Sequence, residues 1–421
     1  MRVGKHFPYT LLKRLAHGTR EGIIDPNHMA LTYATIEGDT SMRVSVLQEN
    51  LYKGLNIVSR AIQSRPTLPI LANVLIATDD ARLQLSATNL ELGITAWIGA
   101  KVEQPGSITV PARTLQELVA TLPPERVDMD LDVRTLTLHL RCGAKSANIK
   151  GMDANEYPLM PSFDAEHAIP VNARGFKEMI DQVVFSAAKE DNRPILTGVM
   201  MRFNGDVLTL AAADGYRLSV RTTTLEFSAG DQGPEPLIVP ARTLNELARI
   251  ISDEDEEVLI GLPDGRGQVM FNLKSALVVS QLIEGKFPDY EAIIPHGSET
   301  QILAYTDDLL AACKSSEVFA KDSSNTARVM VQPSGVPNVP GRVTVAGKSQ
   351  EKGDAEAPVD ASIEGRAVEV SFNIRYLIDV LSVIREDQVM LETSGPTTPG
   401  VVRPAGRDDF IHVIMPMSAG R

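Results

Sequence analysis

The six-residue sequence VPARTL occurs twice, at residues 110–115 and again at residues 239–244. An identical repeat at this separation predicts that the chain contains copies of one structural unit. Each copy is expected to open a helix, because Pro111 and Pro240 suit a first helical position, where a missing N–H leaves no hydrogen bond unmade. Apolar residues then follow at helical spacing, and a looser third copy lies at residues 372–384.

Two further markers recur in the same order around these helices. Upstream of each helix lies a strand-like segment that alternates apolar and polar residues and runs into a turn: LQLSATN, LTLAAAD and VTVAGKS, at 83–89, 208–214 and 343–349. A leading helix is predicted before each of these strands, at 49–62, 173–188 and 306–320. The chain is therefore predicted to be α+β, with three copies of one unit whose antiparallel sheets pack on helices.

The boundaries between copies are predicted near residues 165 and 298, after two similar segments that contain aromatic residues and proline, NEYPLMPSF and FPDYEAIIPHG. Residues 332–341 and 351–365 are predicted to be long loops, because proline, glycine and acidic residues are frequent there. The acidic run at 252–258 is predicted to be a solvated loop.

The net charge of the chain is −13 over 421 residues. Taken alone, this charge argues against a nucleic-acid partner, because duplex binding is driven largely by positive charge that meets phosphate. No stretch approaches 18 apolar residues, which argues against a membrane span. Two cysteines, Cys142 and Cys313, are too few for a disulfide framework or a metal–thiolate site, and a reducing cytoplasm fits this number.

Arg113 lies opposite the apolar stripe of its helix, and Arg242 and Arg375 hold the same position in the other copies. One interpretation is an ordinary surface ion pair within each helix, because a carboxylate follows four residues later in every copy: Glu117, Glu246 and Asp379. The other is that the helices surround an axis and present a basic lining. The leading helices and the residues just after them would add Lys53, Arg60, Arg174, Lys177, Lys189, Lys314 and Lys321 to that lining.

The sequence carries no recognisable catalytic motif. It has no GxxxxGK[ST] phosphate loop and no GxSxG nucleophile elbow, and none of its seven histidines pairs with another at i,i+4 spacing. Asp214, at the end of LTLAAAD, is the one candidate for catalysis, although a turn residue before Gly215 explains it better. We therefore predict no catalytic residue, no metal and no cofactor.

Seven segments of the chain resemble the bacterial DNA polymerase III beta subunit, the sliding clamp. They are MRVSVLQENLYKGL (42–55), RPTLPILANVLI (65–76), VPARTLQEL (110–118), AADGYRLSV (212–220), IVPARTLNEL (238–247), KFPDYEAIIP (286–295) and the near-terminal VIMPM (413–417). The resemblance runs from Met42 to Met417, in the order that the family has. The DGYRL turn, the FPDY segment and the terminal MPM are together specific to this family.

The resemblance implies three clamp domains, at 42–165, 166–298 and 299–421, with antiparallel sheets outside and helices lining a ring. Two chains are expected to close head-to-tail around double-stranded DNA, since a heterologous interface that closes makes a ring. A protein of this kind performs no chemistry. It tethers the replicative polymerase, the clamp loader and other factors to DNA, in the bacterial cytoplasm at the nucleoid, and so raises the local concentration of polymerase at the primer end.

On this resemblance, the residues expected to face DNA are Arg65, Arg113, Lys189, Arg193, Pro194, Ile195, Arg242 and Arg375. Their contacts should be with phosphate, independent of base sequence and sensitive to salt. Pro194 and Ile195 stand where the family can have aromatic residues, which leaves phosphate contacts by Lys189 and Arg193 as the expectation for this loop.

The resemblance also implies a pocket between the second and third domains that takes short linear peptides of partner proteins. Its matching positions are Leu196, Gly215, Tyr216, Arg217, Leu218, Pro288, Ile293, Val413, Met415, Pro416 and Met417. Aliphatic and methionine side chains suit an adaptable apolar pocket, and Tyr216 and Arg217 are expected to supply its polar edge. Ala213 and Ala292 are small where the family can have polar or charged residues, which is expected to alter the peptide preference.

The ring interface is expected to pair the first domain of one chain with the third domain of the other. The matching positions are Ala147 and Ile149 against Val318 and Phe319. Ala147 is smaller than the usual residue at such an interface.

Residues 1–41 fall outside the resemblance, and two explanations stay open: translation naturally begins at Met42, or the segment is a mobile extension. Two other functions also stay open. One is a clamp paralogue that keeps the ring but has a specialised role. The other is an enzyme built on the triplicated scaffold, with Asp214 or another carboxylate as its catalytic residue.

Overall fold

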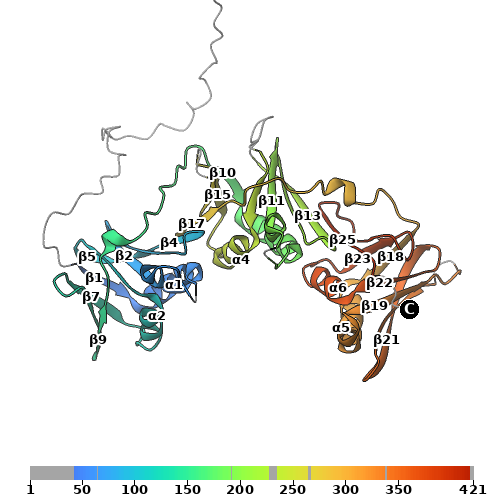
Figure 1. The fold of residues 1–421 in the computed structure, drawn as a ribbon, viewed down its shortest axis with the longest axis horizontal. Coiled ribbons are helices and arrows are strands. Elements are labelled where there is room, and N and C mark those ends of the chain that lie inside the picture. The colour runs from blue at the N-terminus through green and yellow to red at the C-terminus, as the bar shows by residue number, and fades with distance from the viewer. Residues whose placement is uncertain are drawn as a thin grey trace, which may run out of the picture. The chain divides into compact units, whose positions relative to one another are not determined.

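The computed structural model describes residues 42–63, 65–190, 192–226, 235–263, 267–336 and 339–417. The predicted extension at residues 1–41 lies outside the described residues. Six α-helices and a set of antiparallel strands make up the described part of the chain, in the repeating order that the sequence markers predict (Figure 1). No helix in that part is long and apolar enough to cross a membrane.

The three repeats have the same order of elements, except that the first has one additional short strand, β5. The first contains helices α1 (Gln48–Val58) and α2 (Ala112–Ala120) and strands β1 (Arg43–Leu47), β2 (Asn73–Asp79), β3 (Arg82–Thr88), β4 (Leu92–Gly99), β5 (Lys101–Gln104), β6 (Ser107–Pro111), β7 (Arg126–Asp132), β8 (Thr137–Cys142) and β9 (Lys145–Lys150). The second contains α3 (Ala173–Val183), α4 (Ala241–Ile250), β10 (Ile169–Asn172), β11 (Gly198–Asn204), β12 (Val207–Ala213), β13 (Arg217–Thr224), β14 (Leu237–Pro240), β15 (Glu257–Gly261), β16 (Gln268–Asn272) and β17 (Ala276–Gln281). The third contains α5 (Thr306–Ala320), α6 (Ile374–Leu381), β18 (Thr300–Tyr305), β19 (Thr326–Gln332), β20 (Gly341–Ser349), β21 (Gly353–Gly365), β22 (Val368–Asn373), β23 (Gln388–Thr393), β24 (Gly400–Pro404) and β25 (Phe410–Ile414).

Sheets run across the boundaries between repeats. At the first junction β4 pairs antiparallel with β17, and the joined sheet has the order β10-β15-β16-β17-β4-β3-β2-β6. At the second junction β13 pairs antiparallel with β25, and the sheet continues from β14-β11-β12-β13 into β25-β24-β23-β18-β21-β20-β19-β22. The remaining strands form a sheet of order β5-β1-β7-β8-β9, in which β9 is an edge strand.

One face of each helix is buried against these sheets, because apolar residues recur every three or four positions. In α2 the buried apolar positions include Leu115 and Val119. Helix α1 packs on β3 and β4, α3 on β12 and β13, and α5 on β20 and β21. The two helices of each repeat lie side by side, as the pair α5 and α6 shows in Figure 1.

The two prolines of the VPARTL copies lie one residue earlier than predicted. Pro111 and Pro240 end strands β6 and β14 and precede the helices, which begin at Ala112 and Ala241. A strand end tolerates proline, because the missing N–H removes no bond from the interior of the ladder. In the third copy Asn373 holds this place, and its side chain accepts a hydrogen bond from the backbone N–H of Arg375.

The prediction of a long loop at 351–365 is wrong, because β21 is a 13-residue strand from Gly353 to Gly365. Small apolar residues such as Ala355, Ala357 and Val359 alternate there with exposed acidic residues, and a two-residue alternation is the signal of a strand. The acidic composition concealed that pattern. The loop predicted at 252–258 is confirmed for residues 252–256, whereas Glu257 and Val258 belong to β15. Of the loop predicted at 332–341, the described residues between the end of β19 at Gln332 and the start of β20 at Gly341 lie outside any strand.

Candidate functional site

An apolar cluster covers one side of the second junction, and we call it the junction cluster. Its buried members are Met200, Ala211, Ala213, Leu218, Val220, Ile238, Phe287, Tyr290, Val401, Ile411 and Val413, against which Ile195, Leu196, Ile283, Ile293 and Ile294 pack half-buried. Leu218 and Val413 are paired across β13 and β25. Since side chains alternate along a strand, Ser219 and His412 face the opposite side, where Ser219 contacts Ser186 of η5 (Val184–Ser186).

The DGYRL turn borders the junction cluster. Asp214 Oδ1 accepts hydrogen bonds from the backbone N–H groups of Tyr216 and Arg217, at 2.8 and 3.0 Å. Gly215 has φ of +92°, and a Cβ at this position would stand 2.7 Å from an Arg193 guanidinium nitrogen. The left-handed backbone therefore favours glycine here, whereas the exposed end of Arg193 could move away from a Cβ. The turn leaves the Tyr216 side chain 62% exposed beside the apolar cluster.

The connection between the second and third repeats runs over the junction cluster and is held at its middle. Arg202 of β11 donates hydrogen bonds to Tyr290 Oη and Glu291 Oε1, both at 2.8 Å. The bond from Arg202 lowers the pKa of Glu291, whereas burial raises the pKa of Tyr290. This anchor keeps the following η7 helix (Glu291–Ile293), and with it Ile293, against the cluster.

The end of the described chain closes the same region. The backbone N–H of Met415 donates to the Tyr216 carbonyl at 2.8 Å, and that of Met417 donates to the Ser371 carbonyl at 2.8 Å. Met415, Pro416 and Met417 are half-buried. The terminal MPM segment is thereby fixed to the DGYRL turn on one side and to β22 on the other.

Arg217 is not at an exposed polar edge, contrary to the prediction. Its side chain is buried, donates to Asp214 Oδ2 at 3.1 Å and to the Phe185 carbonyl at 2.6 Å, and lies 4.2 Å above the Tyr376 ring. A further bond of 2.6 Å to Asp379 Oδ2 crosses from the second repeat to the third. Arg217 therefore fastens the two repeats together and leaves Tyr216 as the exposed residue of the turn.

The structure thus gathers the predicted pocket residues in one place. Leu196, Leu218, Ile293 and Val413 lie in the junction cluster, Gly215, Tyr216 and the MPM segment border it, and Pro288 is exposed on the connection above it. Sequence reasoning missed Met200, Val220, Ile238, Val401 and Ile411, although strand alternation from Leu218 and Val413 points to Val220 and Ile411. It also missed Arg202, for which the sequence carries no signal.

Each of the six helices presents an exposed basic residue to solvent: Lys53, Arg113, Arg174, Arg242, Lys314 and Arg375 in chain order. The interpretation as ion pairs within each helix holds only for the first copy, where Arg113 Nε lies 2.9 Å from Glu117. Arg375 pairs instead with Glu317 of α5 at 3.4 Å. Among the described residues no ion pair reaches Arg242, because Glu246 receives Arg60 and Arg249.

Of the remaining residues predicted to face DNA, four are exposed to solvent and one packs on the junction cluster. Arg65, Lys189, Arg193 and Pro194 are exposed. Ile195 packs half-buried on the junction cluster, and Arg193 reaches over the DGYRL turn. This loop therefore lies beside the apolar site as well as beside solvent.

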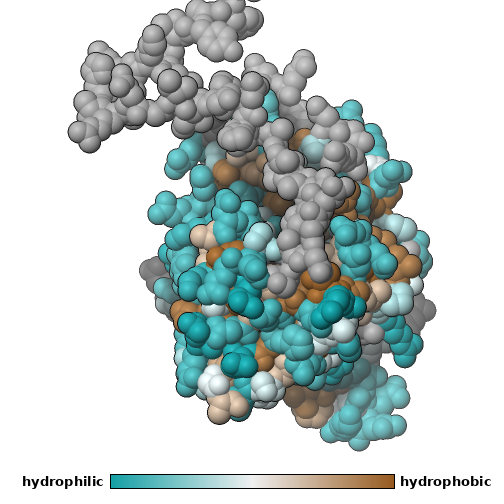
Figure 2. All heavy atoms as spheres, turned by 90° about the vertical axis from the view of Figure 1, so that its left-hand side faces the viewer, coloured by the Kyte–Doolittle hydropathy of each residue, from teal (hydrophilic) through white to brown (hydrophobic). Residues whose placement is uncertain are grey.

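The four residues predicted at the ring interface differ in exposure. On edge strand β9, Ala147 is half-buried and Ile149 is buried in the core. On α5, Val318 is 56% exposed and Phe319 is half-buried. Figure 2 views the molecule from the side where β9 lies, and the described surface there is mostly hydrophilic with hydrophobic side chains in small groups.

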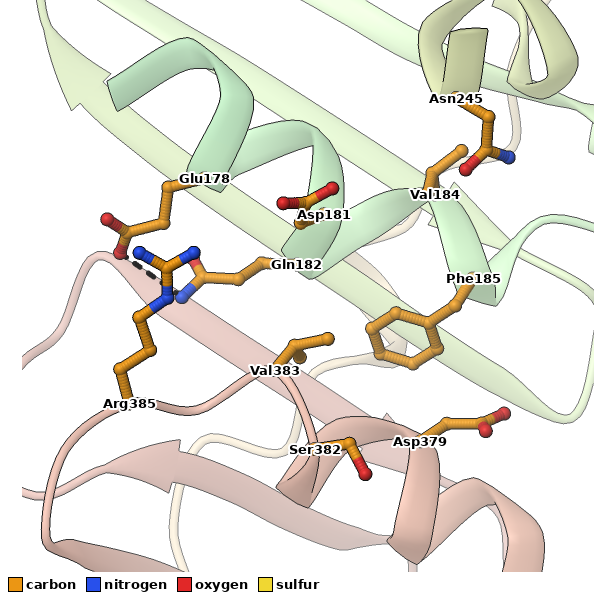
Figure 3. Close-up of a pocket in the computed structure, with 10 residues that line it drawn as sticks. All are labelled: Glu178, Asp181, Gln182, Val184, Phe185, Asn245, Asp379, Ser382, Val383 and Arg385. Carbon is orange, nitrogen blue, oxygen red and sulfur yellow. Dashed lines mark hydrogen bonds between the residues drawn. The ribbon is translucent and has the colours of Figure 1, made fainter. Parts of the chain in front are cut away.

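A separate hollow of about 410 Å³ opens at the second junction on the helix side of the sheet (Figure 3). One wall of the hollow is formed by α3 and the η5 helix that follows it, and the other by the end of α6. The hollow is lined by Glu178, Asp181, Gln182, Val184, Phe185, Asn245, Asp379, Ser382, Val383 and Arg385. Sequence reasoning did not find it, because its walls come from two repeats. No group of three or more metal-ligating side chains suited to a metal ion exists in the described part of the chain.

Comparison with known proteins gives a consistent result over nearly the whole described chain. Family models of the DNA polymerase III beta subunit match residues 42–161 (N-terminal domain), 170–289 (central domain) and 291–418 (C-terminal domain). The beta sliding clamp of Synechococcus elongatus is 31% identical over 379 residues, which span 89% of this chain and 99% of that protein. The beta sliding clamp of Bacillus subtilis is 29% identical over 386 residues, with the same coverage.

Solved structures resemble the fold over a similar range. The DNA polymerase sliding clamp from Bacillus subtilis has a TM-score of 0.84 at 27% identity, covering 90% of this chain and all of that one. A sliding clamp from Pseudomonas aeruginosa bound to griselimycin has a TM-score of 0.82 at 28% identity, with the same coverage.

Proposed function

The chain belongs to the bacterial DNA polymerase III beta subunit family, the beta sliding clamps, and from this premise we propose which of its residues meet DNA, partner proteins and a second copy of the chain. Its function is that of a sliding clamp, a non-catalytic processivity factor of DNA replication. The alternative that the chain is an enzyme is set aside, because the family is non-catalytic. Asp214, its candidate residue, is engaged in a turn and in the ion pair with Arg217.

The pairing of strands at the two junctions supports a ring of two chains. At both junctions the strand that follows a marker strand, β4 or β13, pairs with the last strand of the next repeat, β17 or β25. The corresponding strands at the two ends of the described chain each have an unpaired edge. Strand β9 is the last strand of the first repeat, and its outer edge is unpaired. Strand β21 follows the marker strand of the third repeat, and its residues 353–360 are unpaired on the side away from β20. An unpaired edge is a template for another strand. We propose that β21 of one chain pairs with β9 of the other, which closes a head-to-tail dimer.

The charges of these two edges are complementary. Strand β9 carries Lys145 and Lys150, whereas the unpaired part of β21 carries Asp354, Glu356 and Asp360. Opposite charges favour the correct register and disfavour pairing of β9 with a second β9. Val318 and Phe319 on α5, which packs on β21, would then meet the partner near Ala147, and Ile149 would support that strand from the core.

The exposed cations on the six helices support a DNA-facing role for this surface. A modest basic lining suits sliding, because contacts that are too tight would hold the clamp in one place. Arg113, Arg242 and Arg375 are proposed to approach phosphates, together with Arg65 and Lys189 beside the helices. Arg193 and Pro194 are kept as candidates, and Ile195 is proposed to act in the junction cluster instead.

The junction cluster is the observation that carries the partner site. It combines buried aliphatic residues with the exposed Tyr216 ring and the half-buried methionines of MPM, which together offer an adaptable apolar surface for a short peptide. The replicative polymerase and the clamp loader are the proposed owners of such peptides. We propose that partner peptides bind the clamp at the nucleoid in the bacterial cytoplasm. The proposed domain boundaries are 42–165, 166–298 and 299–421.

The experiment that tests this site is fluorescence-polarisation binding of a labelled peptide of the QLxLF type. The matched control is a truncation that lacks Met415–Arg421. Saturable binding of about micromolar strength by the intact chain, lost in the truncation, is the expected result. Absence of binding by the intact chain would contradict the partner role and favour the remaining alternative, a clamp paralogue with a specialised task.

A further inference from the structure

The hollow on the helix side of the second junction is richer in acceptors than in donors. Glu178, Asp181 and Asp379 contribute three carboxylates, whereas Arg385 is the only cation in its lining. Glu178 already receives Arg407, and Asp379 receives Arg217 through one oxygen. The side chains of Phe185 and Val383 provide an apolar floor between these carboxylates (Figure 3).

Two polar groups in the hollow lack partners within the described chain. The Gln182 side chain is 1% exposed, its Nε2 donates to Glu178, and its Oε1 accepts no hydrogen bond. Asp181 is half-buried, and no hydrogen bond or ion pair reaches its carboxylate from the described residues. Its burial raises its pKa, although Lys177 and Arg385 oppose that change. A buried acceptor without a donor costs about 1–3 kcal/mol, so Gln182 Oε1 favours a ligand that brings an N–H donor. The half-buried Asp181 carboxylate favours a ligand that brings a positive charge.

The first junction shows what fills the equivalent place elsewhere in the same chain. Helices α1 and α3 have 11 residues each and lead directly into three-residue helices, η2 (Ser59–Ala61) and η5, so that Arg60 corresponds to Phe185. The Arg60 guanidinium crosses the first junction to Glu246 at 2.8 Å. Glu246 is the sixth residue of α4, as Asp379 is of α6.

A second cation of the first junction is also missing from the second. Arg249 of α4 pairs with Glu246 at 3.1 Å, and the corresponding residue of the third repeat is Ser382, which lines the hollow. At the first junction two guanidinium groups therefore surround the carboxylate. At the second junction the same two positions hold Phe185 and Ser382, which line the hollow, and Arg217 is the one guanidinium that reaches Asp379 from the described residues.

We propose that this hollow binds a small organic cation, an alkylguanidinium or alkylammonium compound of the size of agmatine. The cationic group would lie between Asp181 and the Asp379 oxygen that Arg217 does not bind. It would act as the second cation beside this carboxylate, as Arg249 does beside Glu246 at the first junction. An N–H group would donate to Gln182 Oε1, and the methylene chain would lie on Phe185 and Val383. The volume of about 410 Å³ suits a small molecule.

The choice of a small molecule over a protein side chain rests on the function proposed above. If the helices face DNA, a protein partner at the hollow would compete with the duplex for the same space. A small cation would instead neutralise the acidic lining at this junction and reduce its repulsion of phosphate. Occupancy would then adjust how freely the clamp moves along DNA.

The test is isothermal titration of the full chain with agmatine, without DNA and at fixed ionic strength. One variant removes the unpaired carboxylate, Asp181→Asn. A second, Ser382→Arg, installs the guanidinium that the first junction has at this position. The matched control is Asp307→Asn, which removes an exposed carboxylate from the first turn of α5, outside the hollow.

We expect saturable binding by the native chain and by the control, about tenfold weaker binding by Asp181→Asn, and none by Ser382→Arg. Equal affinity of Asp181→Asn and the native chain would overturn the proposal, as would absence of saturable binding. Peptide binding measured on the same samples reports separately on the proposed function. Loss of agmatine binding with intact peptide binding therefore contradicts this inference alone.

Discussion

Arg217 Nη1 lies 2.6 Å from Asp379 Oδ2, and this bond joins the second repeat to the third. The guanidinium also reaches Asp214 and the Phe185 carbonyl, and it stacks on the Tyr376 ring. The residue that closes the DGYRL turn beside the proposed partner site is thus the one that joins the two repeats at this junction. The junction and the site it carries should therefore respond together to changes at this position.

Arg217→Met is expected to destabilise the chain by about 2–3 kcal/mol, because it leaves Asp214 without its charged partner and removes the bond across the junction. This free-energy cost is smaller than that of breaking a fully buried ion pair, because Asp379 is partly exposed to solvent. Urea denaturation measures the change. The control Arg126→Met removes an exposed pair with Asp128 and should cost less than about 1 kcal/mol. Equal losses in the two variants would contradict a junction role for Arg217.

Ile293→Glu is expected to abolish binding of the QLxLF-type peptide while leaving the fold intact. The residue is half-buried on the junction cluster, and a carboxylate there would be desolvated by any apolar ligand. Fluorescence polarisation measures the loss. Leu159→Glu, at an 86% exposed position in the connection of the first junction, serves as control and should bind normally. Normal binding by Ile293→Glu would place the peptide elsewhere.

Val318→Glu is expected to shift the chain from dimer to monomer, because a carboxylate buried at the ring interface costs about 2–3 kcal/mol. A closed ring of two chains contains two such interfaces, so the two carboxylates together are expected to raise the dissociation constant of the dimer by about 10³- to 10⁴-fold. Sedimentation velocity over a range of concentrations measures the shift. Val336→Glu, in a loop and equally exposed at 56%, should remain dimeric. If both variants stay dimeric, α5 lies outside the ring interface.

Removing Arg113 and Arg242 together is expected to flatten the salt dependence of DNA binding. For each of these arginines that meets a phosphate, its removal should reduce the slope of log K against log salt concentration by about 0.9. Both side chains are exposed, Arg113 at 91%, so stability should change little. Binding to duplex DNA measured between low and moderate salt gives the slope. The control Arg126→Ala removes one exposed arginine outside the helices and should leave the slope unchanged. An unchanged slope would remove these arginines from the DNA-facing set.

Acid is expected to weaken the second junction through His412. Complete burial, followed by the nearby Arg217 charge, holds the pKa of His412 well below 6.5. The neutral ring contributes stability that is fully present above pH 6.5. That contribution is lost as the pH falls from there toward the lower pKa of the folded state, because the unfolded chain takes up the proton first. The ring accepts or donates a hydrogen bond with Ser219 at 2.7 Å and lies against Phe185.

Thermal unfolding measured from pH 8 to pH 5 in the native chain and in His412→Phe tests this effect. Both proteins lose stability through their shared carboxylates, so the difference between the two curves isolates His412. The stability of the native chain relative to His412→Phe should decrease as the pH falls, since only the native chain carries the histidine. Parallel curves would contradict the lowered pKa, because they would mean that His412 takes up its proton equally readily in the folded and the unfolded chain.

Features that depend on neighbours in the sequence were predictable. The three marker types identified three α+β repeats, because helical and strand periodicities are written within segments of about ten residues. The DGYRL turn follows from Asp214, whose side chain closes the turn on its own backbone, and from Gly215, which alone tolerates the required φ. The predicted pocket residues came from the resemblance to the family, and the structure places them around one cluster.

Features that depend on which segments meet across the junctions were not predictable. In the sequence Arg375 precedes Asp379 by one helical turn, yet in the structure Asp379 receives Arg217, and Arg375 pairs with Glu317. The burial of Arg217 and the hollow beside Gln182 have the same origin. Ion pairs and cavities form where surfaces from two repeats come into contact, and the free energy of that contact is decided by long-range packing rather than by local periodicity.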